Sequence, residues 1–566
     1  MNSDDPTIRA LVCEACWDGI FSVHGWQTVL ASGVPVDDNA AKFVKARERI
    51  TDISSPESYQ LALECLDNCI RTHHAQCPPP QTAAFLPDRV IDCSNVRNPK
   101  IVLTGGNQHG LYVTLSYVWG GQQPMTTTKN IDKYVTEGLQ ISEFPQTIQD
   151  AILVTHNIGQ RYLWIDALCI LQDSVQDKNR QLGQMRYIYR NAYLTINAAC
   201  AKSSHEGFLH RFRPQKVPNA KIPYRCPDGM LGSIWIAEQF DTNARDASHS
   251  YWDELEPITY RGWCLQEKLL PPRSLIYASD TLKYYCQTET VNIGHALCEP
   301  STGRRLPSAA YRPTEPNTTK PSESDRVAYR QAWLAVVFMY TFRNISVPSD
   351  RLVALAGVAE QFHLVYNDQY LAGLWRRTLL FDLLWESSSA IGRPQPRPKG
   401  YRAPSWSWAS IDGLINAEYR VDELVLPPAL DTALVRICQV NIIDCQVNVA
   451  SEEAPFGEVT GGILKLKGLM KEVFLGESGS VLSAYPNHES KEIGYVSFDA
   501  DEERQGPIHV VPALWDARGS FVMGLVLATA DADQPTYKRV GRFQNRNSVA
   551  DLMWLEGLCE QEIVVV

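Results

Sequence analysis

The spacing of apolar residues predicts alternating strands and helices between residues 106 and 290. Four short apolar runs are typical of buried strands: 112–117, 162–165, 193–198 and 274–278. Three stretches with helical spacing separate these runs: 145–158, 179–191 and 261–270. Strand–helix alternation favours a mainly parallel α/β sheet in which the four strands are neighbours. Within this range, residues 201–258 form an expected insertion that contains a short strand at Ile234–Ile236.

Residues 1–105 predict a mostly helical N-terminal region. Its clearest helix runs from Glu57 to His74 and stops before the prolines at 78–80, because proline disrupts a helix interior. Two short segments at 86–92 and 101–104 look like strands. We expect the helix to pack against the α/β domain.

Beyond residue 290 the pattern divides the chain into three parts. Residues 291–328 are rich in Pro, Ser, Thr and Arg, which is typical of a linker. Residues 329–400 predict a helical segment, with Leu371–Leu384 among its strongest stretches. Residues 401–566 predict a β-rich C-terminal region.

Composition and net charge argue against several classes of protein. The chain has 566 residues, 44% of them hydrophobic, and a net charge of −11. An acidic chain without a long basic run is a poor candidate for binding nucleic acid. No apolar stretch reaches the roughly 18 residues that a membrane-spanning helix needs, and the N-terminus lacks the features of a secretory signal. We therefore expect a cytoplasmic protein with no membrane span and no nucleic-acid partner.

The cysteines raise the question of a metal site. The chain has fifteen cysteines, and Cys13 and Cys16 have the spacing of zinc ligands. Cys65, Cys69 and His73 repeat every fourth residue along one helix face. Such a face belongs more often to a core, and in a protein that is not secreted most cysteines are reduced and buried. The prediction is therefore no metal and no cofactor, with structural zinc at the N-terminus as the alternative.

Three sequence blocks carry a resemblance to a known family. The first is Leu115-Ser-Tyr-Val-Trp-Gly120, and the second runs from Phe144 to Ala192 and includes Leu163-Trp-Ile-Asp166. The third is Arg261-Gly-Trp-Cys-Leu-Gln-Glu267, followed by Pro272 and Arg273. In these blocks and their order the chain resembles the heterokaryon-incompatibility (HET) domain proteins of filamentous fungi. Family-like segments continue to about residue 413, whereas the last 150 or so residues resemble nothing that we can name.

The resemblance implies a role in programmed cell death during nonself recognition between fused hyphae. HET domains also look like remote relatives of TIR domains, which have a flavodoxin-like sheet, and Trp263-Cys-Leu-Gln-Glu267 is similar to the helix that carries the TIR catalytic glutamate. By position, this resemblance makes Glu267 the catalytic carboxylate of an enzyme that cleaves NAD, with NAD as its substrate. The insertion of about 60 residues before this helix departs from the TIR pattern.

The carboxyl ends of the predicted strands place further polar and aromatic groups near Glu267, because open α/β sheets bind ligands at this edge. A carboxylate beside the ribose would stabilise the positive charge that develops when nicotinamide leaves. Asp166 would hold a ribose hydroxyl, and Trp263 would stack on a base or wall the pocket. The candidate substrate-binding residues are Ser116, Tyr117, Trp119, Asp166 and Trp263.

Structural interpretations of the same residues remain open. Glu267 would pair with Arg261 or Arg273 on the surface, and Asp166 would accept hydrogen bonds from the turn that follows it. Trp119 and Trp263 would be core aromatics. At the level of the whole protein, the alternatives to a death effector are a non-catalytic scaffold that binds protein partners or itself, and a HET-like protein recruited as a biosynthetic enzyme.

Overall fold

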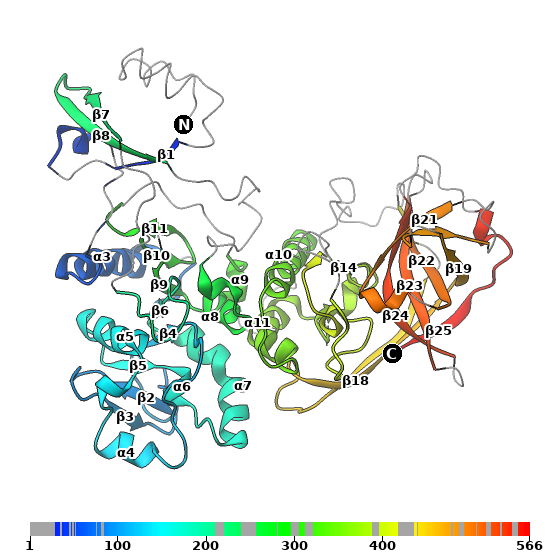
Figure 1. Cartoon of the computed structure of the whole chain (residues 1–566), viewed down its shortest axis with the longest axis horizontal. Helices are drawn as coiled ribbons and strands as arrows, with labels where there is room; N and C mark the ends of the chain where they lie inside the picture. The colour runs from blue at the N-terminus through cyan, green and yellow to red at the C-terminus, as the bar shows by residue number, and fades with distance from the viewer. Residues whose placement is uncertain are drawn as a thin grey trace. The chain divides into compact units, whose positions relative to one another are not determined.

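The chain forms two compact units, residues 1–312 and 313–566, in a computed structural model (Figure 1). The structure describes residues 29–33, 37–44, 47, 50, 52–74, 76–80, 84–209, 220–238, 256–279, 281–295, 305–311, 321–387, 395–416, 435–437, 440–476, 479–485, 492–504, 506–516, 522–531, 535–545 and 553–566.

An eight-stranded sheet forms the centre of the first unit, in the order β11-β10-β9-β6-β4-β5-β2-β3. Its strands are β2 (Arg89–Asp92), β3 (Lys100–Leu103), β4 (Tyr112–Ser116), β5 (Tyr162–Trp164), β6 (Leu194–Asn197), β9 (Arg273–Tyr277), β10 (Leu282–Cys286) and β11 (Thr290–Asn292). Strand β4 pairs in parallel with β5 and β6, and β6 pairs in parallel with β9. The prediction that these four segments are parallel neighbours is confirmed.

The outer strands correct the prediction of a mainly parallel sheet. Strands β2 and β3 on one side, and β10 and β11 on the other, all pair antiparallel. The connections β2–β3, β9–β10 and β10–β11 are short, and a short connection makes a hairpin, whereas a parallel pair needs a long crossover. The sheet is therefore mixed, and its strands β2 and β3 confirm the two short strands predicted at 86–92 and 101–104.

Helices cover both faces of the sheet (Figure 1). The longest are α3 (Pro56–Thr72), α5 (Gln146–Asn157), α7 (Val175–Asn191) and α8 (Trp263–Leu269). α3 and α5 lie on one face, α7 and α8 on the other. Leu66 of α3 lines a small apolar cavity with Leu275 and Tyr284 of the sheet, so the predicted packing of this helix is confirmed. The side chains of Ser55 and Ser174 cap α3 and α7 by accepting backbone N–H groups.

Shorter elements complete the first unit. They are α4 (Ile131–Thr136), η3 (Ile141–Glu143), α6 (Asp166–Cys169), η5 (Pro257–Tyr260), η6 (Ile293–His295) and α9 (Ser308–Tyr311). A second, three-stranded sheet has the order β1-β8-β7. It consists of β1 (Val29–Gly33), β7 (Ala220–Arg225) and β8 (Leu231–Glu238), with η2 (Asn39–Lys42) beside it. The strand expected at Ile234–Ile236 is part of β8.

The second unit begins with helices, one short hairpin (β12–β13) and a second two-stranded pair (β14–β15) whose strands are far apart in the chain. Its elements before the large sheet are α10 (Glu323–Thr341), α11 (Asp350–Tyr366), β12 (Tyr370–Leu371), β13 (Leu374–Trp375), η7 (Arg376–Thr378), α12 (Leu379–Asp382), β14 (Glu386–Ser387), η9 (Trp408–Ser410) and β15 (Ile415–Asn416). The predicted helix over Leu371–Leu384 is therefore wrong in its first part, whereas η7 and α12 make Arg376–Asp382 helical. Ala372 and Gly373 have φ angles of 48° and 99° and turn the chain into a hairpin. A Cβ at Gly373 would lie 2.7 Å from the Trp408 ring, so the turn also depends on close packing.

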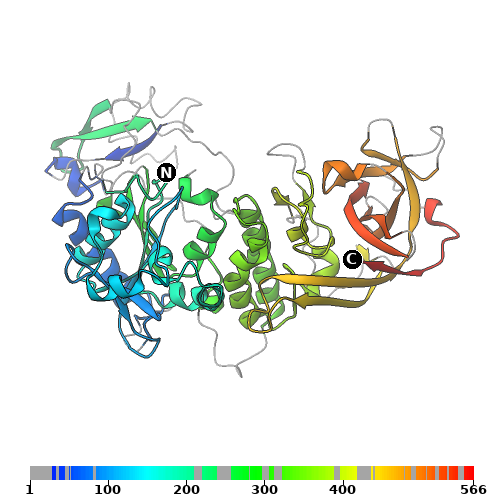
Figure 2. The ribbon, with the colours of Figure 1, turned by 60° about the horizontal axis from the view of Figure 1, so that its bottom comes forward.

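A closed ring of antiparallel strands dominates the rest of the second unit (Figure 2). Six strands form the ring: β19 (Lys471–Leu475), β20 (Val481–Ser483), β21 (Glu492–Phe498), β22 (Ile508–Asp516), β23 (Val522–Asp531) and β24 (Thr536–Asn545). The sheet continues outside the ring with β16 (Val435–Ile437), β17 (Asn441–Val449), β18 (Val459–Gly468) and β25 (Gln561–Val565), of which β25 pairs in parallel with β24. The pairings run β22-β19-β20-β21-β24-β23 and return to β22. The short elements η10 (Asp501–Arg504) and η11 (Met553–Leu555) lie between strands. The predicted β-rich C-terminal region is a barrel with an apolar core that includes Val510 and Phe543.

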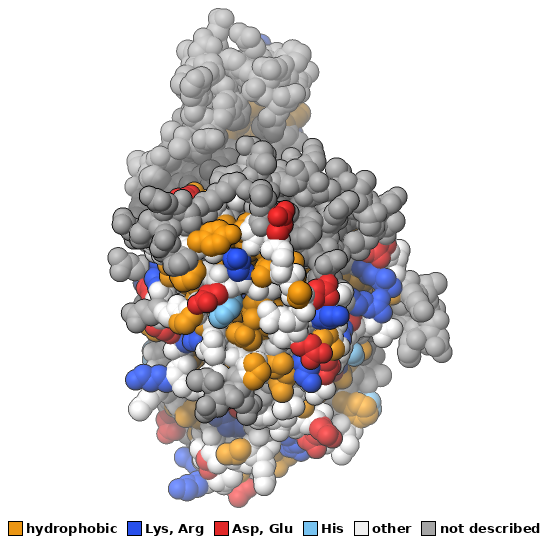
Figure 3. Space-filling view, turned by 90° about the vertical axis from the view of Figure 1, so that its right-hand side faces the viewer, with side chains coloured by type: hydrophobic (Ala, Val, Ile, Leu, Met, Phe, Trp, Pro, Cys, Tyr) orange, Lys and Arg blue, Asp and Glu red, His pale blue; other side chains and the backbone are white. Residues whose placement is uncertain are grey.

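The surface of the second unit mixes charges of both signs. On the face in Figure 3, Lys and Arg side chains are interspersed with Asp and Glu, and apolar side chains form small groups between them. Among the described residues on this face, no extended basic patch of the kind that binds nucleic acid is visible. No helix in the described part of the chain is both long enough and apolar enough to cross a membrane.

Candidate functional site at the carboxyl edge of the parallel strands

Two of the predicted site residues stand where neighbouring parallel strands end. Ser116 is the last residue of β4, and Asp166 follows β5 after one intervening residue. The chain passes from β4 to β5 on one side and returns to β6 on the other, so the strand order reverses at β4. Open α/β sheets bind ligands outside the carboxyl ends of their strands at such a reversal.

Glu267 reaches this edge from helix α8. The Ser116 hydroxyl donates a hydrogen bond of 2.5 Å from Oγ to Glu267 Oε2. Glu267 is only 3% exposed, and Ser116 is fully buried. The carboxylate therefore lies against the end of β4, and its burial excludes the alternative of a surface ion pair with Arg261 or Arg273.

Asp166 and Trp119 form a second polar contact at the same edge. The Trp119 indole donates from Nε1 to Asp166 Oδ2 at 2.9 Å. The other carboxylate oxygen, Oδ1, accepts the backbone N–H of Ala167 at 2.7 Å. Both side chains are partly exposed to solvent. Asp166 thus accepts one backbone N–H of the turn that it begins, which agrees in part with the structural interpretation, and it still presents a carboxylate at the sheet edge.

Arg261 interacts electrostatically with the carboxylates of both Glu267 and Asp166. Its guanidinium lies 5.9 Å from the centre of the Trp119 ring and donates from Nη1 to the backbone carbonyl of Tyr117. Its positive charge lowers the pKa of both Glu267 and Asp166. Sequence reasoning considered Arg261 only as a surface partner of Glu267, although its place in the third block was a signal that the two would be close.

The remaining two predicted residues differ in their surroundings. Tyr117 is 1% exposed, and its hydroxyl accepts a hydrogen bond of 2.9 Å from Gln123 Nε2. Burial raises the pKa of the Tyr117 hydroxyl well above its usual value. Trp263 begins α8, one turn before Glu267, and remains partly exposed. The interpretation of a core aromatic thus fits Tyr117 better than it fits Trp119 or Trp263.

The two carboxyl groups are perturbed by their environment. Burial raises the pKa of Glu267 to about 7, with a further increase from the nearby charge of Asp166. Arg261 and the hydrogen bond from Ser116 oppose this increase. Burial also raises the pKa of Asp166, again against the charge of Arg261. A buried carboxyl group that titrates near neutral pH is characteristic of functional sites, although ion-pair networks produce it too.

These residues define a class of protein: an α/β domain with two carboxyl groups, a guanidinium and two partly exposed indoles at the carboxyl edge of its parallel strands. Residues 112–267 match the family model of the heterokaryon incompatibility protein (HET). The chain thus contains a HET domain, as the sequence blocks predicted. The match begins at the first residue of β4 and ends at Glu267, so it includes all six predicted site residues. No curated protein matches the chain, and neither does any solved structure.

The cysteines considered as metal ligands have different positions. Cys13 and Cys16 lie outside the described residues. Cys65 lies on α3 and is partly buried. Cys69 and His73 do come together, but with Cys77 and Cys286, which sequence reasoning had not grouped with them.

Proposed function

We propose that this protein acts in heterokaryon incompatibility, as an effector of programmed cell death during nonself recognition in fungal hyphae. Its HET domain would deliver the signal from the cytoplasm by cleaving NAD, after self-association or binding of a protein partner. The observation that carries the proposal is the contact of Glu267 with Ser116 at the end of β4, beside Asp166 and Arg261.

The strand order supports a flavodoxin-like or TIR-like relationship. If the four parallel strands are numbered along the chain, their order in the sheet is 2-1-3-4. Flavodoxin-like sheets have the order 2-1-3-4-5 and bind their ligand where strands 1 and 3 diverge. Strands 1 and 3 are here β4 and β6, and Ser116 ends β4. Glu267 would therefore occupy the expected ligand-binding edge of such a sheet.

Cleavage of NAD requires little from the protein beyond charged groups held in the right positions. Nicotinamide leaves as a neutral group, and the ribose develops positive charge in the transition state. Glu267, in its ionised form, would stabilise this charge, since a fixed carboxylate acts strongly where water is excluded. Asp166 would accept a ribose hydroxyl, and Arg261 would attract the diphosphate. Trp119 and Trp263 would stack on the flat rings of the ligand.

One observation favours a second candidate function, a non-catalytic scaffold. Glu267 is buried and already hydrogen-bonded within the protein, so its role would be to hold α8 against β4. In that case the domain would signal through partners or self-association alone. The two candidates differ in what the removal of one charge should do.

Induced expression of the full chain in a fungal host tests the proposal. The wild type should kill hyphal compartments, and Glu267→Gln should abolish killing while the amount of folded protein stays the same. Glu143→Gln, which alters an exposed carboxylate in the same unit, is the matched control and should kill normally. Full killing by a well-folded Glu267→Gln protein would overturn the catalytic proposal in favour of the scaffold.

A further inference from the structure

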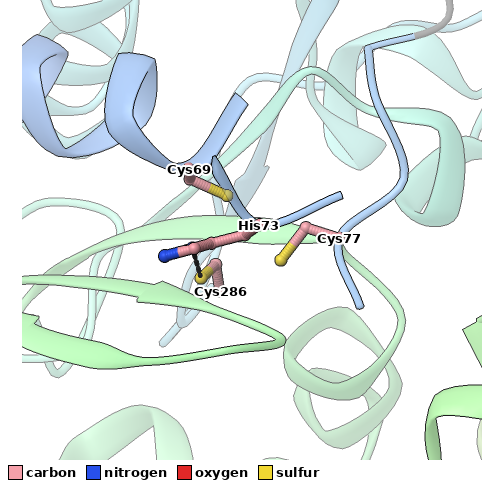
Figure 4. Close-up of side chains that lie close together, drawn as sticks. All are labelled: Cys69, His73, Cys77 and Cys286. Atoms are coloured by element: carbon pink, nitrogen blue, oxygen red, sulfur yellow. Dashed lines mark hydrogen bonds between the residues drawn. The ribbon is translucent and has the colours of Figure 1, made fainter. Parts of the chain in front are cut away.

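Four side chains of the kind that bind metals converge in the first unit (Figure 4). Cys69 lies in the last turn of α3, His73 is its C-cap, Cys77 follows in the next turn, and Cys286 ends β10. One ligand atom from each residue lies within 4.8 Å of all the others. Since Cys286 and His73 are 213 positions apart, only the fold brings them together.

The backbone at the end of α3 explains how three of the four residues come to share one side. Cys69, His73 and Cys77 are spaced by four residues. The His73 N–H donates to the Cys69 carbonyl at 3.1 Å, and the Cys77 N–H donates to the His73 carbonyl at 2.8 Å. Hydrogen bonds of this span place residues four apart above one another on one face. The three side chains therefore point to the same place although the helix ends between them.

The β10–β11 hairpin supplies the fourth side chain and polar contacts around it. The Cys286 N–H donates to the Glu289 carbonyl at 2.9 Å, which closes the turn. In return the Glu289 N–H donates to Cys286 Sγ at 3.4 Å, and the Thr288 hydroxyl lies 3.5 Å from Cys77 Sγ. Backbone and hydroxyl donors aimed at sulfur stabilise thiolates, and such contacts commonly surround metal-bound cysteines.

His73 is oriented as a ligand would be. Its Nδ1 lies 3.4 Å from Cys286 Sγ, so this nitrogen faces the cysteines. Its Nε2 lies 3.7 Å from a carboxylate oxygen of Glu289 on the other side of the ring. A carboxylate near the far nitrogen favours a proton there, and that tautomer leaves the near nitrogen able to bind a metal.

The chemistry of the four donor atoms indicates which metal ion would bind. Three sulfurs and one imidazole nitrogen suit zinc, which takes four such ligands in a tetrahedron. Ligand atoms about 2.0–2.3 Å from a tetrahedral zinc lie roughly 3.4–3.8 Å apart, which is compatible with the observed cluster. The three cysteines are at most 1% exposed, and the His73 side chain is 13% exposed. A disulfide would use two of the thiols and would leave the orientation of His73 unexplained.

We propose that Cys69, His73, Cys77 and Cys286 bind one structural zinc ion that fastens the end of α3 to the β10–β11 edge of the sheet. Four protein ligands close the coordination sphere, so the ion has no open position for a substrate. The site is independent of the Glu267 site, and either proposal can fail without the other.

Metal analysis of the purified full chain, prepared under reducing conditions, tests the proposal. The wild type should carry about one equivalent of zinc per chain, the stoichiometry of a single four-ligand site. Cys77→Ser and Cys286→Ser should each lose it. Cys65→Ser, one turn before Cys69 on the same helix, is the matched control and should keep it. A Cys13→Ser/Cys16→Ser double variant should also keep it, and loss of zinc from this variant alone would assign the ion to the N-terminus and overturn the proposal.

A second measurement covers the case in which the ligand variants do not fold. Wild-type protein stripped of metal by a chelator should melt at a lower temperature and recover with added zinc. With cobalt it should show the visible absorption of a tetrahedral ion and a thiolate-to-cobalt charge-transfer band. Folded, fully reduced wild type that neither carries zinc nor takes up cobalt would overturn the proposal. So would alkylation and mass analysis that finds two of the three thiols joined in a disulfide.

Discussion

The hydroxyl of Ser116, at the end of strand β4, donates a 2.5 Å hydrogen bond to the carboxylate of Glu267 on helix α8, 151 positions further along the chain. The contact ties the first block of the HET domain to its last. Both residues are buried, so the carboxylate depends on this donor and on the charge of Arg261 for its stabilisation. This dependence can be measured.

Replacement of Ser116 by Ala should lower the free energy of unfolding by about 1–3 kcal/mol at pH 8, because a buried carboxylate loses its hydroxyl donor. Urea denaturation of the full chain provides the measurement. Ser142→Ala, at an exposed position in the same unit, should change the stability by less than about 0.5 kcal/mol. Equal stability of the two variants would mean that the hydrogen bond contributes nothing.

The stability of the protein should depend on the titration of Glu267. Burial raises its pKa in the folded protein to about 7, whereas an exposed glutamate titrates near pH 4.3. The folded state holds this proton more tightly, so the resulting stabilisation is complete below about pH 4 and is lost as the pH rises through about 7. Glutamine does not titrate. The free energy of unfolding of Glu267→Gln, relative to wild type, should therefore increase from pH 5 to pH 8, by on the order of 3 kcal/mol.

Denaturation of both proteins at several pH values checks this prediction. A difference in unfolding free energy that stays constant with pH would refute the raised pKa of Glu267. Glu143→Gln should follow the wild-type profile, because that carboxylate is exposed.

Removal of the Arg261 charge should destabilise the protein more at high pH than at low pH. The guanidinium lowers the pKa of both Glu267 and Asp166, so Arg261→Met leaves two carboxyl groups without their cation. The loss of stability should be larger at pH 8, where Glu267 is ionised, than at pH 5, by roughly 1–3 kcal/mol. Arg225→Met, at an exposed position of the same unit, is the control. A loss that does not change with pH would assign Arg261 a packing role only.

A buried ion pair next to the barrel core should contribute strongly to the stability of the second unit. Arg539 and Asp499 are both fully buried and lie 2.7 Å apart, and the Arg539 guanidinium stacks 3.3 Å from the centre of the Trp385 ring. Arg539→Met should cost about 1.5–3 kcal/mol, because it removes the nearer of the two arginine partners of the buried Asp499 and leaves only Arg397, at 3.4 Å. Arg504→Met breaks an exposed pair with Asp501 and should cost less than about 1 kcal/mol in the same denaturation experiment. Similar losses in the two variants would contradict this assignment.

The parallel strands were predictable because each is a short apolar run, and helices with clear spacing lie between them along the chain. The outer strands β2 and β3 were predicted as well, at 86–92 and 101–104, but the strands on the other side of the sheet were not. Strand β10, Leu282–Cys286, was not recognised, and its pairing with β9 depends on a turn rather than on a crossover. The hairpin at Ala372–Gly373 was not predicted, because the apolar residues around it have helical spacing. The turn depends on positive φ angles and on contact with Trp408, which the sequence pattern does not reveal.

The functional sites, too, could be predicted from the sequence only in part. Glu267, Ser116 and Asp166 were found because the family blocks and the sheet-edge rule place them at one edge. Of the cluster of Cys69, His73, Cys77 and Cys286, the sequence suggested only Cys69 and His73. The four-residue spacing of Cys69 and His73 was visible, but Cys77 follows the end of the helix, and Cys286 joins the group through a contact more than 200 positions away. Spacing alone does not identify ligands that the tertiary fold brings together.

Release of nicotinamide from NAD tests the central claim most directly. Purified full-length wild type and Glu267→Gln, matched for folding by circular dichroism and incubated at high protein concentration, should differ completely. The proposal predicts release by the wild type and by Glu143→Gln, and none above background by Glu267→Gln. Absence of release from wild-type protein that still kills hyphae, or equal release by Glu267→Gln, would contradict it.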